Sequence, residues 1–142
     1  MTRVTFEVVG VPAPQGSKRH VGRGVLVESS KALGPWRDAV AWAAHDAARR
    51  HGITAPLDGP LRLVVEFRFP MPKARPKRVR DTGVVWKSTQ PDSDKLARAV
   101  GDALTDSGLI VDDARICELV AAKVETTGWT GAVIVVETME EL

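Results

Sequence analysis

Apolar and polar residues alternate along several stretches of the chain, and this alternation predicts β-strands. The clearest stretch is 61–69, where apolar residues occupy every odd position and Arg, Val, Glu and Arg fall between them. The segment 3–8 has the same period of two, which is typical of a strand with one buried face. Two further strands are expected near 115–124 and 132–138.

A spacing of three and four residues between apolar positions predicts two helices. The first is expected over 35–51, where Pro35 suits a first helical turn and Gly52 a helix end. The second is expected to begin near Ser93 and to end at Gly108. The apolar positions that repeat in this way are Trp36, Val40, Ala43 and Ala47 in the first helix and Leu96, Ala99, Val100, Ala103 and Leu104 in the second.

The order of these elements is β-α-β-α-β-β, which predicts one α+β domain over residues 1–142 with a mixed sheet flanked by two helices. A basic segment near 17–27 is expected to be a loop or an extra short hairpin. The three prolines between positions 70 and 76 argue against a helix in the segment 70–80. We expect Cys117 in the core, Trp42 in packing contacts, and Trp86 in a half-buried strand.

Composition narrows the class of protein. Apolar residues make up 44% of the chain and charged residues 27%, the mix of an ordinary globular protein. One cysteine excludes an internal disulfide, and the three histidines lack the spacing of a zinc site. Without an apolar run of about 20 residues or a signal-peptide pattern, we expect no membrane partner and a cytoplasmic, nucleoid-associated location.

The net charge of +2 conceals an uneven distribution of charge. Residues 1–91 hold 16 Lys and Arg against 7 Asp and Glu, whereas residues 92–142 hold 4 against 11. This asymmetry indicates a polyanionic partner for the basic part and a different task for the acidic part.

Carboxylates gather around the second predicted helix. Asp92 and Asp94 stand at its start, Arg98 lies one turn beyond Asp94, and Asp102 lies one turn beyond Arg98. The pair Asp112-Asp113 follows shortly after the helix end, so three or four carboxylates are expected to converge beside a basic residue.

Two interpretations of these aspartates remain open. An aspartate at a helix start is usually a cap, and an aspartate pair is usually a turn. Converging carboxylates repel one another unless a cation neutralises them, and magnesium or manganese prefers such oxygen ligands.

Basic residues cluster in two segments framed by proline or glycine. Five of the eight residues from Lys73 to Arg80 are basic, and a second group surrounds Arg19. Such loops either aid solubility or neutralise phosphates beside a metal site. The candidate DNA-binding residues are Lys18, Arg19, Lys73, Arg75, Lys77, Arg78 and Arg80.

The run PDSDKLARAVGDALTDSGLIVDDARI at 91–116 resembles the signature of RusA-like Holliday-junction resolvases, which occur in bacteria and phages. In that family an Asp-x-Asp pair opens a helix, a basic residue follows one turn later, and a double aspartate comes after a short loop. The segment VPAPQGSKR at 11–19 is similar to the family's opening loop. The resemblance covers nearly the whole chain.

The resemblance implies a homodimer that binds four-way DNA junctions and makes paired symmetric nicks in recombination and repair, with Mg²⁺ as cofactor and Mn²⁺ as a substitute. It places the three metal-holding catalytic carboxylates on Asp92, Asp94 and Asp113. The family's catalytic lysine falls on Arg98, which keeps the charge but cannot give up a proton near neutral pH. Supporting roles fall on Asp102, Asp112 and Lys95, the last standing where the family often has Asn.

Three other functions remain possible on the sequence alone. The same residues would serve a metal-dependent nuclease for flaps or other branched DNA. A non-catalytic DNA-binding protein would use the aspartates only as caps and turns. A dimeric structural adaptor would use the uneven charge for self-association.

Overall fold

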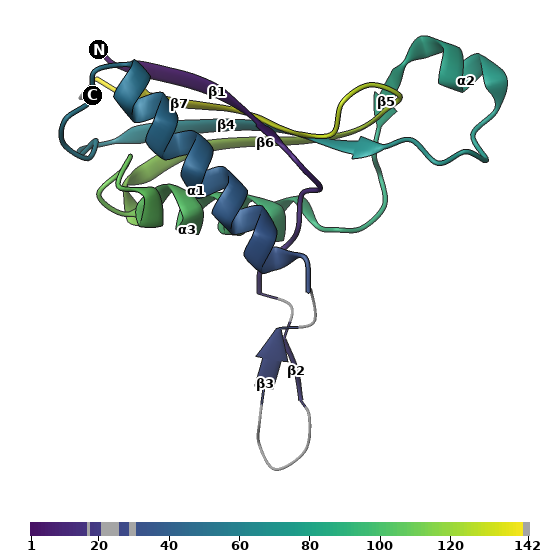
Figure 1. Ribbon diagram of the computed structural model, residues 1–142, viewed down its shortest axis with the longest axis horizontal. Helices are drawn as coiled ribbons and strands as arrows, with labels where there is room; N and C mark the ends of the chain where they lie inside the picture. The colour runs from purple at the N-terminus through teal and green to yellow at the C-terminus, as the bar shows by residue number, and fades with distance from the viewer. Residues whose placement is uncertain (17, 21–25, 29–30, 141–142) are drawn as a thin grey trace.

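A five-stranded mixed sheet forms the body of the molecule, with two long helices on one face (Figure 1). The computed structural model describes residues 1–16, 18–20, 26–28 and 31–140. The elements are β1 (Arg3–Val9), β2 (Lys18–His20), β3 (Leu26–Glu28), α1 (Leu33–Arg50), β4 (Leu61–Pro70), α2 (Lys77–Thr82), β5 (Val84–Trp86), α3 (Ser93–Ser107), the 3₁₀ turn η1 (Asp113–Arg115), β6 (Ile116–Thr126) and β7 (Gly131–Thr138).

The strand order in the sheet is β1-β7-β4-β6-β5. Strands β4 and β6 run parallel, and the other neighbouring pairs are antiparallel. Leu63 pairs with Leu119 in a register that is regular from Arg62–Glu118 onward and shifts between Leu61 and Arg62. Strands β2 and β3 form a separate two-stranded sheet.

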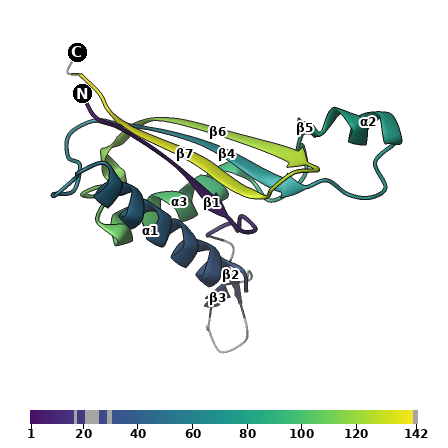
Figure 2. The same cartoon turned by 45° about the horizontal axis from the view of Figure 1, so that its top comes forward.

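The core lies between the sheet and helices α1 and α3 (Figure 2). Every odd position of β4 from Leu61 to Phe69 is buried on the helix side, which confirms the alternation predicted for this segment. The helices contribute the buried residues Trp36, Val40, Ala44, Ala47, Leu96, Ala99, Val100, Ala103 and Leu104. Within the part of the chain that the structure describes, no helix is long and apolar enough to cross a membrane.

The predicted α+β class and mixed sheet are confirmed, but the expectation of no helix in 70–80 is wrong. Helix α2 covers Lys77–Thr82, and Pro76 occupies its N-cap position with a φ of −56°. All three prolines precede the helix, and a missing N–H there removes no helical hydrogen bond. Residues 72–86, which include helix α2 and strand β5, project from the body as an extended arm (Figure 1).

Three predicted burials are also wrong. Cys117 is exposed, and Trp42 and Trp86 retain 72% and 78% of their accessible surface. Cys117 stands at the start of β6, where β5 does not reach, and Trp86 belongs to a strand of three residues at the end of the sheet. A strand pattern therefore places Trp86 in the sheet without determining whether another layer covers it.

Candidate active site

Asp92 occupies the N-cap position of α3, with extended dihedral angles of φ −69° and ψ 140°. Its backbone carbonyl accepts the hydrogen bond from the Leu96 N–H at 3.1 Å, but its side chain makes no capping hydrogen bond. The carboxylate instead lies 3.8 Å from the Lys95 Nζ. Helix capping therefore does not account for the Asp92 side chain, which stays exposed at the helix start.

The two aspartates after α3 have different surroundings. Asp112 Oδ1 accepts a hydrogen bond from the Ala114 N–H at 3.0 Å and so fixes the η1 turn. Asp113 packs against α3 at Gly101, where an added Cβ would lie 3.3 Å from the Asp113 Cβ. Glycine at position 101 lets the Asp113 side chain approach the helix.

Neighbouring carboxyl groups perturb the titration of this pair. The pKa of Asp113 is raised by its hydrogen bond with Asp112, then by burial and by the negative charge of Asp102. The pKa of Asp112 is lowered, first by the backbone N–H of Ala114. Asp113 therefore sits among carboxyl groups that disfavour its charged form, and a bound cation would relieve this repulsion.

Asp94, Arg98 and Asp113 line one cavity of about 320 Å³, which opens beside the parallel strands β4 and β6. The other lining residues are Leu63, Ala97, Gly101, Ile116 and Leu119. Helix α3 places Asp94 and Arg98 one turn apart, and η1 brings Asp113 to them. Of the three or four carboxylates expected to converge, Asp94 and Asp113 are the two that line this cavity among the described residues.

Asp92 does not share this cavity. It lines a separate one of about 420 Å³ with Pro14, Gln90, Pro91 and Lys95. Across the described ranges, no three His, Cys, Asp or Glu side chains are arranged to hold a metal ion. Asp94 and Asp113, which line one cavity, are carboxylates, and Asp102 and Asp112 add negative charge beside Asp113. Such oxygen donors suit a hard divalent cation.

The loop before residue 17 fixes α3 in place. The Gln15 N–H donates to the Lys95 carbonyl at 3.0 Å, and Gln15 Nε2 donates to the Asp102 carboxylate. Gly16 adopts a φ of +92° and lies so close to Arg98 that an added Cβ would be 2.5 Å from the Arg98 Nη1. Sequence reasoning missed this role of Gln15, and the only available signal was its place in the opening loop of the resolvase pattern.

A comparison with known protein families matches residues 8–137 to the family described as Endodeoxyribonuclease RusA. The chain belongs to the RusA family. The match runs from β1 into β7 and includes every element that lines the two cavities. No curated protein sequence matches the chain. RusA proteins are crossover junction endodeoxyribonucleases and generally depend on a metal ion, so this chain is a nuclease of that class.

The basic arm of this RusA protein holds one of its arginines in a structural ion pair. Arg75 donates two hydrogen bonds of 2.9 Å to the carboxylate of Glu125, a residue that is only 1% exposed. The Arg75 guanidinium lowers the pKa of Glu125 below its usual value. Arg75 therefore ties the arm to the end of β6.

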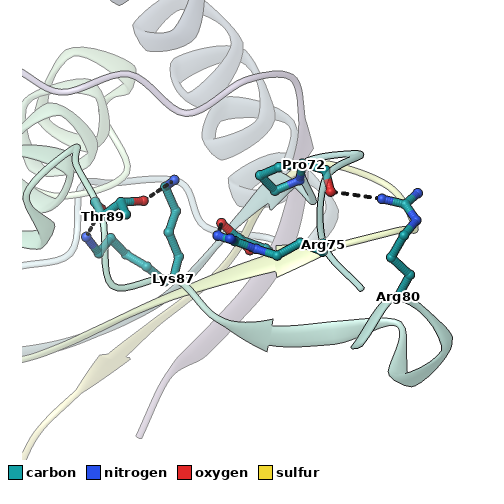
Figure 3. A network of polar contacts seen from close by, with 7 residues as sticks. Pro72, Arg75, Arg80, Lys87 and Thr89 are labelled. Carbon is teal, nitrogen blue, oxygen red and sulfur yellow. Dashed lines mark hydrogen bonds and ion pairs between the residues drawn. The ribbon is translucent and has the colours of Figure 1, made fainter. Parts of the chain in front are cut away.

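Other cations of the arm also have partners within it. Lys77 pairs with Asp81 at 2.9 Å, and Arg80 donates to the Pro72 carbonyl at 2.9 Å (Figure 3). Lys73 and Arg78 are exposed, and neither makes an ion pair or side-chain hydrogen bond to another described residue. The side chains of Lys18 and Arg19 lie outside the described part of the chain.

Two lysines that sequence reasoning missed hold the segment between the arm and α3. Lys123 Nζ donates to the carbonyls of Thr89 and Pro91, both at 2.8 Å. Lys87 Nζ donates to Thr89 Oγ1 at 2.9 Å and lies 5.1 Å from the centroid of the Phe69 ring (Figure 3). These contacts set the position from which the chain enters α3 at Asp92.

Proposed function

We propose that this RusA protein is a magnesium-dependent endonuclease that resolves four-way DNA junctions by paired symmetric nicks in recombination and repair. The observation that carries the proposal is the single cavity shared by Asp94, Arg98 and Asp113 in a chain of this family. Two carboxylates beside one guanidinium form a site for a cation and a phosphate together.

The carboxylates of Asp94 and Asp113, with Asp92 two residues before Asp94, would hold Mg²⁺ or Mn²⁺. When bound, the cation supplies positive charge at the scissile phosphate and lowers the pKa of a water molecule. Asp102 anchors the Gln15 loop on α3 through its carboxylate. Lys95, whose Nζ lies 3.8 Å from the Asp92 carboxylate, would balance the charge of that residue. Asp112 fixes the turn that presents Asp113.

Arg98 acts on the phosphate through its charge and its hydrogen bonds. A guanidinium stays protonated at neutral pH, so it donates hydrogen bonds to phosphate oxygens without transferring a proton. Gly16 leaves space for the guanidinium beside the cavity. This arginine would stabilise the negative charge that develops on the phosphate during attack.

The arm would contact the DNA backbone outside the cavity. Lys73 and Arg78 are its best candidates, because their charges are exposed and not paired within the described residues. Lys18 and Arg19 would add to this contact. A four-way junction has an approximate two-fold axis, so a homodimer would present one cavity to each of two opposite strands.

The test is cleavage of a labelled synthetic four-way junction, with duplex, flap and splayed-arm substrates as controls and with Mg²⁺ present or absent. We expect symmetric paired nicks in the junction, only with Mg²⁺. Cleavage of flaps or duplex in preference to the junction would contradict the proposed substrate and favour a nuclease for other branched DNA. Junction binding without cleavage in Mg²⁺ or Mn²⁺ would contradict the catalytic assignment.

A further inference from the structure

We infer that Gln15 is a positioning residue for catalysis: by holding the Asp102 carboxylate, it keeps the guanidinium of Arg98 available to a phosphate of the DNA. This inference deepens the proposed nuclease function and rests on the phosphate-binding role given there to Arg98. The contacts that carry it join the loop before residue 17 to helix α3.

Arg98 and Asp102 stand four residues apart on α3, the spacing at which opposite charges on a helix are neighbours and attract each other. Lys77 and Asp81 of α2 have the same order and spacing, and they pair at 2.9 Å. Arg98 and Asp102 do not pair, and no described residue forms an ion pair with Arg98. Asp94, the other carboxylate four residues from Arg98, is assigned to the cation, so Asp102 is the acidic neighbour that remains.

Gln15 takes the place on Asp102 that Arg98 would otherwise occupy. An ionised carboxylate only accepts hydrogen bonds, and Gln15 Nε2 donates one to Asp102 Oδ2. Gln15 Oε1 is buried and has no hydrogen-bond partner within the described part of the chain. A buried carbonyl oxygen without a donor is unfavourable, so the contact with Asp102 accounts for the position of this amide, and hydrogen bonding of its own oxygen does not.

The loop is anchored where it presents this amide. Ala13 is buried in the core between the sheet and the helices, and the Gln15 N–H donates to the Lys95 carbonyl at 3.0 Å. At Gly16, which has a φ of +92°, an added Cβ would lie 2.5 Å from the Arg98 Nη1. One loop therefore contacts both members of the unformed ion pair, the guanidinium through a glycine and the carboxylate through an amide.

The amide matters because Gln15 carries no charge. An arginine bound to Asp102 would neutralise both groups, whereas a neutral donor binds the carboxylate and leaves its charge in place. Asp102 then keeps its negative charge near Asp113, which packs against the preceding helix residue, Gly101. Arg98 keeps its positive charge at the cavity that it shares with Asp113. Both charges are thus retained where a cation and a phosphate would bind together.

A second-site rescue tests this role. Gln15→Met keeps the length of the side chain but removes its donor, so Arg98 would pair with Asp102 and withdraw from the phosphate. We expect single-turnover cleavage of the four-way junction in Mg²⁺ to fall about tenfold. Adding Asp102→Asn removes the competing carboxylate and should recover most of that loss. A residue that only braces the loop predicts no recovery, because the double variant lacks both partners of the contact.

DNA binding without metal gives a second readout. Junction binding is titrated in EDTA at a series of salt concentrations, and the slope of log K against log salt reports the number of phosphate contacts. Gln15→Met should reduce the slope by about 0.9, the value of one contact, as should Arg98→Met. The double variant with Asp102→Asn should return to the wild-type slope.

The matched control is Arg37→Met, which breaks another side-chain bond to α3, the 2.6 Å contact with Asp106, and should change neither the slope nor the cleavage rate. Melting curves establish that each variant is folded, and Gln15→Leu, which also lacks a donor, replaces Gln15→Met if the latter is not. Wild-type cleavage and slope in the single variant, or a double variant that recovers neither, would overturn the role of Gln15. A wild type that cleaves no junction but shows the expected pattern of slopes would refute the proposed function alone.

Discussion

The acidic site and the basic arm are both dense in charge, yet their side chains are in opposite situations. At the site, Asp94 and Asp113 share a cavity with Arg98, and surrounding carboxyl groups raise the pKa of Asp113. In the arm, Arg75, Lys77 and Arg80 have partners of their own. The charge of Asp113 therefore faces further carboxyl groups, whereas most of the basic charges of the arm already have partners.

This difference shows that a cluster of charges indicates a binding site only when its members lack partners within the protein. Repulsion among the carboxylates is a cost that a cation would remove. The arm stabilises itself, and only Lys73 and Arg78 are left to contact an external phosphate among its described side chains. Four variants sharpen this contrast.

The largest effect is expected at Asp94. Asp94→Asn removes a charged ligand from the cavity, so junction cleavage should fall about 1,000-fold while junction binding is retained. Asp106→Asn is the matched control, because Asp106 is an exposed carboxylate of the same helix that pairs with Arg37. Single-turnover cleavage and gel-shift titration separate the two quantities. Magnesium-dependent nicking by Asp94→Asn at the wild-type rate would contradict a catalytic role for Asp94.

A smaller loss is expected from Gly101→Ala. The new Cβ would stand 3.3 Å from the Asp113 Cβ, and the displaced carboxylate should lower kcat about tenfold. Alanine is the better helix former by about 1 kcal/mol, so Tm should not fall. Gly34→Ala in α1 meets nothing within 4 Å and serves as the control. Unchanged kcat would mean that the position of Asp113 does not limit cleavage.

In the arm, neutralising the two unpaired cations should weaken DNA binding without affecting chemistry. Lys73→Gln with Arg78→Gln is expected to reduce the slope of log K against log salt by about 1.8, because each phosphate contact contributes about 0.9. The control, Lys77→Gln with Asp81→Asn, removes a charge pair that is already neutral and should change the slope little. Equal slopes for both double variants would contradict the distinction between paired and unpaired cations.

The smallest effect is expected on stability, from Glu125→Gln. Because Arg75 lowers the folded-state pKa of Glu125 below its ordinary 4.5, the stabilisation is fully present above that pH and is lost as pH falls through the lowered pKa. At pH 7 the variant should melt a few degrees below the wild type, and the difference should shrink as the pH falls below 4.5. Glu66→Gln breaks a half-exposed pair with Arg68 and should change Tm less. A Tm difference that does not depend on pH would contradict the role of this charge.

Much of the fold was predictable because its signals are local. The period of two in β4 and the helical spacing in α1 and α3 reflect burial against one neighbouring layer, so they appear directly in the sequence. The placement of β7 between β1 and β4 depends on contacts between distant segments, which no local pattern encodes. Helix α2 is not predictable from the local sequence, because prolines usually break helices and only the structure places all three before its first turn.

In the candidate site, too, the features set by local spacing were predictable and those set by long-range contacts were not. Asp94 and Arg98 are one helical turn apart, so their shared face follows from spacing alone. The separation of Asp92 into its own cavity depends on the path of the chain through Gln90 and Pro91. The pairing of Arg75 with Glu125 joins positions 50 apart and was hidden within a tract that looked uniformly basic.

The contact between Gln15 and Asp102 limits which related sequences can recombine into a functional protein. The two residues are 87 positions apart, and Gln15 Nε2 donates to the carboxylate that adjoins Asp113. A crossover anywhere between positions 15 and 102 would combine the Gln15 loop of one parent sequence with helix α3 of another. Functional chimaeras of such proteins should therefore keep the parental combination at positions 15 and 102, and a library of shuffled genes selected for activity should show the two positions travelling together.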